Sequence, residues 1–268
     1  MSRRNSVFYG GSLKPSNPPV KYVPRSPVIS IPTSIGHVRV LAFETSSTSG
    51  SVALLEGDRV VCEIDLPRQQ RSAQALAPAM SAALAEAGWR AQDIQLVAVT
   101  QGPGSFTGLR VGVASAKAFA YAVGAEVIGV NTLEAIAAQA PLGCGETWAI
   151  LDAHRRQLFV ARFRLHETEL PEETVPTSVR DIDAWLAEYS PSQFVAGPGV
   201  SRIAARLPVG AKVVDPTIAT PRASTVGLVA LRRFTQGERH DLWSFVPIYY
   251  RPSAAEEKHQ DGAEGSAA

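Results

Sequence analysis

The order of the predicted elements repeats once along this chain, and no other sequence feature constrains the fold as strongly. In the first half, three short β-rich runs precede an amphipathic helix, a buried strand and an alanine-rich helix. In the second half the same order runs from a hairpin at 148–165 to a closing helix at 223–236. Each half therefore has the order β-β-β-α-β-α, which predicts an α/β fold of two similar halves side by side.

Local periodicity sets the boundaries of these expected elements. The strands of the first half are 38–45, 51–56, 60–66, 96–100 and 126–130, and its helices are 73–87, 107–123 and 132–140. The strands of the second half are 148–152, 158–165, 173–176, 194–196 and 212–214, and its helices are 179–189 and 223–236. The predicted core stripe of the 73–87 helix is Ala73, Leu76, Ala77, Met80, Leu84 and Ala87.

Charge divides the 268 residues into a folded middle and two ends. Residues 1–36 hold five Lys or Arg, no acid and many Pro and Ser, so we expect a disordered basic leader. Residues 254–268 are expected to form a frayed acidic tail. The folded part is then 37–253, which we divide into an N-terminal half at 37–140 and a C-terminal half at 141–253.

Composition argues against several classes of function. The formal net charge is +1, from 26 basic and 25 acidic residues, which argues against a dedicated nucleic-acid surface. Two cysteines, Cys62 and Cys144, are too few for a disulfide scaffold or a zinc finger. They fit a reducing cytosol, so we expect a cytoplasmic location. No apolar run approaches the roughly 20 residues that span a membrane, so no membrane partner is expected.

A first candidate site is the turn after the first strand. Glu44 ends this strand, and a run of hydroxyl residues that begins with Thr45 and Ser46 follows it. Backbone N–H groups and hydroxyls that converge at a turn bind phosphate well, and an acid beside them helps to hold a metal. A plain Ser/Thr hairpin turn is the open alternative.

A second candidate is the turn Gln-Gly-Pro-Gly-Ser-Phe-Thr-Gly-Leu-Arg-Val-Gly at 101–112, which opens a helix. It is not a Walker A loop, because no Gly-Lys-Ser/Thr follows, but free N–H groups at a helix start favour an anion. The residues expected to face that anion are Gly102, Gly104, Ser105, Thr107 and Arg110. The alternative, which the residues alone favour, is close packing of a small-residue helix face made of Gly108, Gly112, Ala116 and Ala120.

Metal chemistry and covalent catalysis have little support in the sequence. The five histidines are scattered with no i, i+3 or i, i+4 pair, and no Cys/His cluster exists, so no metal site is expected. Asp152 ends a second-half strand and is expected to face the same cleft as Glu44. A two-metal nuclease needs more converging acids than these two. No catalytic residue is therefore predicted.

Two halves with such turns resemble the actin-like and Hsp70-like ATPases, an RNase H-like fold in which turns from both halves face a shared cleft. The block 101–112 further resembles the signature of the TsaB (YeaZ) family, bacterial partner subunits in making threonylcarbamoyladenosine in tRNA. Other segments that look like this family are 40–46, 129–135, 151–157, 247–251 and 254–257. The resemblance covers about 38–258 and is strongest in 38–135.

Two departures separate the chain from the family's catalytic paralogue, TsaD. That paralogue carries a His-x-x-x-His metal pair, and the matching positions here are Thr132 and Ile136, neither of which replaces imidazole as a ligand. Where the paralogue has Gly-Gly-Val, this chain has Ala-Gly-Pro-Gly-Val at 196–200, and Pro198 removes a backbone donor. The resemblance therefore implies a subunit that is not an enzyme by itself, and it argues against independent ATP hydrolysis.

The function implied by the resemblance is that of a scaffold. The chain would bind a TsaD-type catalytic subunit and enable it to transfer the threonylcarbamoyl group to tRNA, with a TsaE-type ATPase joining the complex. No cofactor is expected on the chain alone, and ATP or ADP is expected only at the partner interface of the complex. The resemblance also implies a homodimer when the partner is absent, and contact with tRNA only through the complex.

The family pairs through the first two long helices of its N-terminal half. The candidate contacts lie off the core stripe of the first helix and away from the glycine face of the second. Most of them are small, and small residues let helices approach closely. In the first helix they are Ala75, Ala79, Ala82 and Ala83, and in the second they are Ala114, Ala118, Tyr121 and Ala122. The alternative is that the second helix is simply buried inside the monomer.

Other functions remain as alternatives at this stage. The main one is a small actin-fold ATPase or kinase that acts on its own through both phosphate turns. A metallopeptidase and an RNase H-type nuclease are weaker alternatives, because the His pair is missing and too few carboxylates converge.

Overall fold

The computed structural model describes residues 37–47, 49–67, 72–141, 143–166, 169–216 and 218–251. The predicted leader at 1–36 and tail at 254–268 lie outside these residues. Within the described ranges, no helix combines the length and the hydropathy needed to cross a bilayer.

The elements follow the predicted order in both halves. Those of the first half are β1 (Arg39–Glu44), β2 (Ser51–Glu56), β3 (Arg59–Asp65), α1 (Ser72–Ala87), a 3₁₀ turn (Ala91–Asp93), β4 (Leu96–Gly102), α2 (Phe106–Val123), β5 (Glu126–Asn131) and α3 (Thr132–Ala137). Those that follow are β6 (Glu146–Asp152), β7 (Gln157–Arg164), β8 (Glu172–Asp181), α4 (Ile182–Glu188), β9 (Phe194–Ala196), α5 (Val200–Ile203), a 3₁₀ turn (Ala204–Arg206), β10 (Lys212–Val213) and α6 (Ala223–Thr235).

The two sheets have the same topology. The strand order is β3-β2-β1-β4-β5 in the first and β8-β7-β6-β9-β10 in the second. In each sheet the first three strands form an antiparallel meander, and the fourth and fifth run parallel to the first. The predicted repeat of β-β-β-α-β is therefore confirmed strand by strand.

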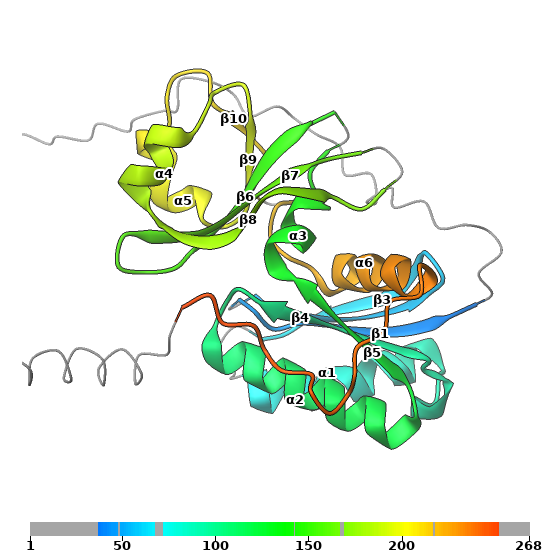
Figure 1. Cartoon of the computed structure of the whole chain (residues 1–268). Helices are drawn as coiled ribbons and strands as arrows, with labels where there is room; N and C mark the ends of the chain where they lie inside the picture. Colours follow the sequence, from blue (N-terminus) through cyan, green and yellow to red (C-terminus); the bar gives the residue numbers. More distant parts are fainter. Residues whose placement is uncertain are drawn as a thin grey trace, which may run out of the picture.

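Different helices cover the two faces of each sheet (Figure 1). In β1, Leu41 and Phe43 lie in the core under α1 and α2, whereas Val40 and Ala42 lie in the core under α6. Successive strand residues point to opposite faces, so a strand covered on both sides is apolar along its whole length.

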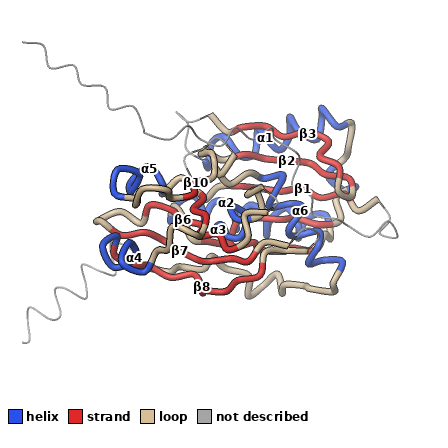
Figure 2. Tube along the Cα trace, turned by 90° about the horizontal axis from the view of Figure 1, so that it is seen from above, coloured by secondary structure: helices blue, strands red, loops and turns tan. Residues whose placement is uncertain are grey.

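The second sheet is covered in the same manner. Trp148 and Ile150 of β6 pack with residues of α4 and α5, while Ala149 and Leu151 pack with Leu133 of α3. Figure 2 looks down on the molecule and shows α4 and α5 together at one end, beyond β6 and β7. The helices α3 and α6 lie between the two sheets (Figure 1).

The closing helix α6 packs on the first sheet rather than the second. Its buried residues Val226, Val229 and Leu231 share a core with Val40 and Ala42 of β1. We assigned this helix to the C-terminal half at 141–253, and the structure corrects that assignment. The first half is completed in space by a segment from the end of the chain.

The chain after α6 returns along the first half and ends at the second. We name residues 238–251 the C-terminal strap, drawn in orange to red in Figure 1. The N–H of Ile248 donates to the carbonyl of Gln101 in β4 (2.8 Å), and the Gln101 amide donates to the carbonyl of Val246 (2.7 Å). At its end, Arg251 donates to the carbonyl of Ala153 in the second half (2.8 Å).

Three predicted boundaries are wrong. The strand expected at 173–176 extends over Glu172–Asp181, because Val179 and Arg180 pair with β7. The helix expected at 179–189 therefore begins only at Ile182, where the N–H of Asp183 donates to the capping carboxylate of Asp181 (2.8 Å). The helix expected at 132–140 ends at Ala137.

Candidate functional site

The two predicted phosphate turns lie against each other. The N–H of Ser105 donates to the carbonyl of Ser46 (2.7 Å), and a Cβ on Gly104 would lie 2.5 Å from the same oxygen. A Cβ on Gly108 would lie 2.0 Å from the carbonyl oxygen of Thr45. These glycines let the two turns and the helix pack closely, which is the alternative that the residues alone favoured.

Gly102 has a similar role toward the strap. A Cβ on Gly102 would lie 2.3 Å from the carbonyl oxygen of Ile248. The glycine-rich turn is thus enclosed by the β1–β2 turn on one side and by the strap on another.

Glu44 is buried at the end of β1 and satisfied within its own turn. Its Oε1 accepts hydrogen bonds from the Ser46 N–H (2.7 Å) and the Ser46 hydroxyl, and its Oε2 accepts one from the Ser47 hydroxyl (3.2 Å). Burial raises the pKa of Glu44 from 4.5 to about 7, because lost hydration outweighs these donors. The Glu44 carboxyl group thus accepts hydrogen bonds from the two residues of the turn, Ser46 and Ser47.

The donors that a phosphate would need are largely used inside the protein. The N–H of Ser46 binds Glu44, and the N–H of Ser105 binds the Ser46 carbonyl. The Ser105 hydroxyl caps α2 by accepting from the N–H of Gly108 (3.3 Å), and Thr107 is exposed in the first turn of that helix.

Arg110, the cation of the glycine-rich turn, is directed to the strap. Its Nε donates to the hydroxyl of Tyr249 (2.9 Å), and its guanidinium lies over the ring of Phe106, 4.0 Å from the centroid. The Phe106 and Tyr249 rings stack with centroids 4.7 Å apart. This cation holds the strap on α2.

Asp152 belongs to a separate cluster at the end of β6. Its Oδ1 accepts from the N–H of His154 (2.8 Å), and its Oδ2 lies 3.3 Å from the Nε of Arg202. The partners of Glu44 are Ser46 and Ser47, so the two acids that we expected to face one cleft are engaged in different halves.

The positions of the paralogue's metal ligands are filled by packing. Thr132 and Ile136 are both fully buried, and Ile136 shares a core with Ala149 and Leu151 of the second sheet. The sec-butyl side chain of Ile136 carries no donor atom, and the hydroxyl of Thr132 does not replace an imidazole ligand. Across the described part of the chain, no three His, Cys, Asp or Glu side chains are grouped so as to hold a metal ion.

The predicted contact face of α1 is wrong for three of its four residues. Ala75, Ala79 and Ala83 are buried in the core of the first half, together with Leu76. Ala82 is exposed, as expected. Two members of the predicted core stripe, Ala73 and Ala77, are exposed instead, so the helix is rotated about its axis relative to the prediction.

The predicted contact face of α2 is exposed. Ala114, Ala118, Tyr121 and Ala122 all lie at the surface, and Tyr121 retains 68% of its accessible area. The opposite face is buried against the sheet, and its small residues are Gly108, Gly112, Ala116 and Ala120. The alternative of a completely buried second helix is therefore wrong.

Apolar side chains of the strap extend this surface. Seven large hydrophobic residues are exposed in the described residues, and five of them lie on α2 or the strap: Tyr121, Trp243, Val246, Ile248 and Tyr249. Trp243 is 74% exposed and meets Tyr121 edge to face, with ring centroids 5.5 Å apart. We name these five residues, with Ala114, Ala118 and Ala122, the docking face.

Sequence reasoning missed the strap residues of the docking face. They lie outside every predicted helix and strand, and a signal existed in the apolar run from Leu242 to Tyr250. Lys117 fixes the strap on α2, because its ammonium donates to the carbonyls of Trp243 (3.1 Å) and Phe245 (3.0 Å). Large apolar side chains exposed on neighbouring elements indicate an interaction site.

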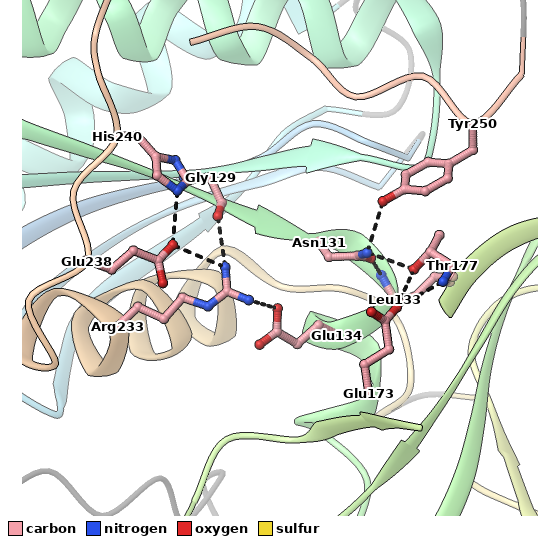
Figure 3. A network of polar contacts seen from close by, with 10 residues as sticks. All are labelled: Gly129, Asn131, Leu133, Glu134, Glu173, Thr177, Arg233, Glu238, His240 and Tyr250. Atoms are coloured by element: carbon pink, nitrogen blue, oxygen red, sulfur yellow. Dashed lines mark hydrogen bonds and ion pairs between the residues drawn. The ribbon is translucent and has the colours of Figure 1, made fainter. Parts of the chain in front are cut away.

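A polar network fixes the root of the strap (Figure 3). Arg233 of α6 donates to the buried carboxylate of Glu134 (2.6 Å) and to the carbonyl of Gly129 (3.2 Å). His240 accepts from the N–H of Gly129 at Nδ1 (3.1 Å), and its Nε2 lies 2.9 Å from Glu238. Burial raises the pKa of Glu134 from 4.5 to about 7, despite the opposing effect of Arg233.

A second polar cluster in Figure 3 links β5 to the second half. The Asn131 amide donates to the Thr177 hydroxyl (2.8 Å) and to the Tyr250 hydroxyl (3.4 Å). Arg233 and His240 of the first cluster and Asn131 and Tyr250 of the second line a cavity of about 520 Å³. The strap forms one wall of this cavity.

Comparisons with known proteins show the family to which the chain is related. The family model TsaD, tRNA N6-adenosine threonylcarbamoyltransferase, matches residues 67–230, more than half of the chain. The chain is 32% identical to the tRNA threonylcarbamoyladenosine biosynthesis protein TsaB of Bacillus subtilis over 148 residues, 55% of this chain and 64% of that protein. It is 27% identical to TsaB of Escherichia coli over 233 residues, 82% of this chain and 98% of that protein.

A solved structure, YeaZ from Pseudomonas aeruginosa, superposes with a TM-score of 0.69 at 26% identity, covering 79% of this chain and 99% of that chain. The fold is thus α/β and actin-like (RNase H-like), as expected from the repeat of two β-β-β-α-β-α halves. More than half of the chain matches the TsaD family model, and relatives named TsaB and a structure named YeaZ match it as well. The chain therefore belongs to the TsaB (YeaZ) family.

Proposed function

We propose that this chain is a non-catalytic partner subunit in the biosynthesis of tRNA threonylcarbamoyladenosine. It binds a TsaD-type catalytic subunit through the docking face and so enables that subunit to modify tRNA. Relatives named for tRNA threonylcarbamoyladenosine biosynthesis support the assignment to this pathway.

The observation that carries the proposal is the docking face itself. A surface that gathers Tyr121, Trp243 and Tyr249 beside a stripe of alanines has the composition of an interface core, in which aromatic residues are enriched. The stripe Ala114, Ala118 and Ala122 repeats every four residues along α2, so a partner helix can approach its backbone closely.

The state of the predicted phosphate turns supports a role without chemistry. Ser105 and Ser46 bond to each other, and Arg110 is engaged with Tyr249 and Phe106. Thr132 and Ile136 stand where the catalytic paralogue has its His pair, and Ile136 packs in an apolar core, which supports the same role. We therefore assign no catalytic residue to this chain.

The proposed complex has further members. A TsaE-type ATPase joins the pair, ATP or ADP binds at the partner interface, and tRNA contacts this chain only through the complex. Without the catalytic subunit the docking face pairs with a second copy of itself. Because tRNA modification is an intracellular process in this proposal, the chain works in the cytoplasm.

The test is reconstitution with the TsaD-type subunit and the TsaE-type ATPase of the same organism. Light scattering after size exclusion gives the mass of each mixture, and mass spectrometry of digested tRNA gives the modified nucleoside. We expect a complex at the summed mass, and modified tRNA only when this chain and the TsaD-type subunit are both present. Magnesium-dependent ATP turnover by this chain alone, without a complex, would instead support an independent actin-fold ATPase.

A further inference from the structure

The root of the strap is attached to an edge of the first sheet. β5 is the last strand in the order β3-β2-β1-β4-β5, and at Gly129 two side chains take the place of a further strand. The N–H of Gly129 donates to Nδ1 of His240 (3.1 Å), and its carbonyl accepts from Arg233 (3.2 Å), as Figure 3 shows. Both bonds satisfy backbone groups on the outer side of an edge strand.

The strap packs closely on β5 at this point. A Cβ on Gly129 would lie 2.9 Å from a ring carbon of Phe245. The His240 and Phe245 rings lie against each other, with centroids 5.6 Å apart. The imidazole is therefore held between the strand and the strap, and 27% of the His240 side chain is exposed.

The hydrogen bonds of His240 fix its protonation state. The N–H of Gly129 can only donate, so Nδ1 of the ring must carry a lone pair. The proton of the neutral ring is then on Nε2, which lies 2.9 Å from Oε1 of Glu238 and donates to it. This geometry requires the neutral Nε2–H tautomer.

Protonation of His240 would remove the acceptor of the Gly129 N–H. An imidazolium carries an N–H on both nitrogens, so the new Nδ1–H would face the N–H of Gly129. Turning the ring over by half a turn would place a carbon–hydrogen group there, so neither orientation satisfies this donor. Because Gly129 is buried, an unpaired N–H at this position destabilises the contact between β5 and the strap.

Charges of both signs surround the ring. Glu238 attracts its charged form and Arg233 of α6 repels it. Other titratable or charged groups on the elements packed around it are Arg239 and Asp241 of the strap, Glu126 of β5, Glu134 of α3, Lys117 of α2 and Tyr250 across the cavity. Glu238 is bonded through Nε2, so it does not relieve the contact between Nδ1 and Gly129.

We propose that His240 is a protonation-sensitive latch, which holds the root of the strap on β5 when neutral and loosens it when charged. The strap carries Trp243, Val246, Ile248 and Tyr249, four of the five large apolar residues of the docking face, so loosening the root disturbs that face. Histidine is the side chain that ordinarily changes charge between about pH 5 and 8. The inference rests on the proposed function in one respect, because it makes pairing with the catalytic subunit depend on pH.

Fluorine NMR of the full chain labelled with 5-fluorotryptophan tests the latch without a partner. Trp243 is the third residue after His240 and meets Tyr121, whereas Trp148 and Trp185 are buried in the second half. Trp243→Phe assigns the Trp243 signal. From about pH 7.5 to about pH 5.5 we expect this signal to shift by more than its linewidth, while the signals of Trp148 and Trp185 stay in place.

Two substitutions separate the charge of His240 from other titrations. His240→Asn keeps an acceptor oxygen near the position of Nδ1 and does not titrate, so the Trp243 signal should stay at its neutral-pH position. His240→Lys offers only donors, so the low-pH position should appear at both pH values. Burial raises the pKa of Glu44 and of Glu134 to about 7, and both acids are unchanged in the two variants. A constant Trp243 signal in the starting protein, or a shift that persists in His240→Asn, would overturn the latch.

Pairing supplies the second part of the test. With the TsaD-type subunit of the same organism at about pH 7.5, His240→Lys should pair at least about tenfold more weakly than His240→Asn, because a smaller fraction of the chain presents an intact docking face. Equal affinities of the two variants would overturn the link between the latch and the docking face. Absence of a complex with every variant would contradict the proposed function instead, and the fluorine signals of the free chain would still decide whether His240 is a latch.

Discussion

At the scale of single residues, two glycines show how closely α2 packs against the turn that follows β1. A Cβ on Gly108 would meet the backbone carbonyl of Thr45 at 2.0 Å, whereas one on Gly112 would meet the Thr45 hydroxyl at 2.2 Å. Gly108→Ala should therefore destabilise by about 2 kcal/mol or more, despite the helix propensity that alanine adds. Gly112→Ala should cost about 1 kcal/mol, because a side chain yields more easily than backbone.

Removing the hydroxyl of Thr45 supplies the control for the Gly112→Ala variant. In a Thr45→Ala background, Gly112→Ala should become nearly neutral, while Gly108→Ala should remain as costly as before. Urea unfolding of the four variants measures both effects. Equal costs for Gly112→Ala with and without the Thr45 hydroxyl would contradict this packing.

Glu44 makes stability depend on pH. Its pKa rises from 4.5 to about 7 on folding, so ionisation opposes the folded state. The contribution to stability is fully present below pH 4.5, is lost as pH rises to 7, and stays lost above 7. Glu44→Gln should flatten the decline in unfolding free energy between pH 5 and 8 by up to about 3 kcal/mol.

Urea denaturation at several pH values checks this slope. Folding also raises the pKa of Glu134, so part of the decline should remain in the Glu44→Gln variant. Glu86→Gln, which changes an exposed acid of α1, is the control and should leave the slope unchanged. Parallel curves for Glu44→Gln and the starting protein would show that Glu44 ionises normally.

At the scale of elements, α1 shows what a sequence pattern fails to decide. Half of its residues are alanine, and alanine is equally acceptable against a core or at a surface, so periodicity did not determine which face is buried. In α2, glycines and alanines on one side and Tyr121 on the other separated the faces correctly. The start of α4 was misplaced because Val179 suits a helix face as well as a strand that continues β8.

The two helices should respond differently to a buried or exposed charge. Ala79→Glu places a carboxylate in the first-half core, so it should lower the unfolding free energy by about 4 kcal/mol or more. Ala118→Glu lies on the docking face, so stability should change by less than about 0.5 kcal/mol while pairing with the TsaD-type subunit is lost. Thermal unfolding and light scattering separate the two effects. A stable, folded Ala79→Glu variant would contradict the burial of that face.

At the scale of the whole molecule, the repeat was predictable, but the packing of α6 on the first sheet was not. The sequence predicted both halves and the β-β-β-α-β order of elements that they share. Periodicity shows that a helix has an apolar face, but not which sheet that face covers, so the placement of α6 on the first sheet was missed. The strap escaped prediction for a related reason, since it is held by hydrogen bonds with Lys117, Gln101 and Arg110 rather than by a regular element.

The crossing of α6 predicts that the N-terminal half is not independent. A fragment of residues 37–140 would expose Val40, Ala42 and Ile128, which α6 covers in the full chain. We expect this fragment to lack a cooperative unfolding transition in urea, and a fusion of 37–140 to 218–251 to regain one. A sharp transition in the bare fragment would show that the first half is stable without α6.

The central claim is that α2 and the strap form the surface that meets a catalytic partner. Hydrogen exchange of this chain, with and without the TsaD-type subunit of its organism, tests it most directly. The account predicts slower amide exchange in α2 (Phe106–Val123) and in residues 240–250 of the strap, with β8 (Glu172–Asp181) unchanged. Protection confined to the second half, with α2 and the strap exchanging as in the free chain, would contradict it.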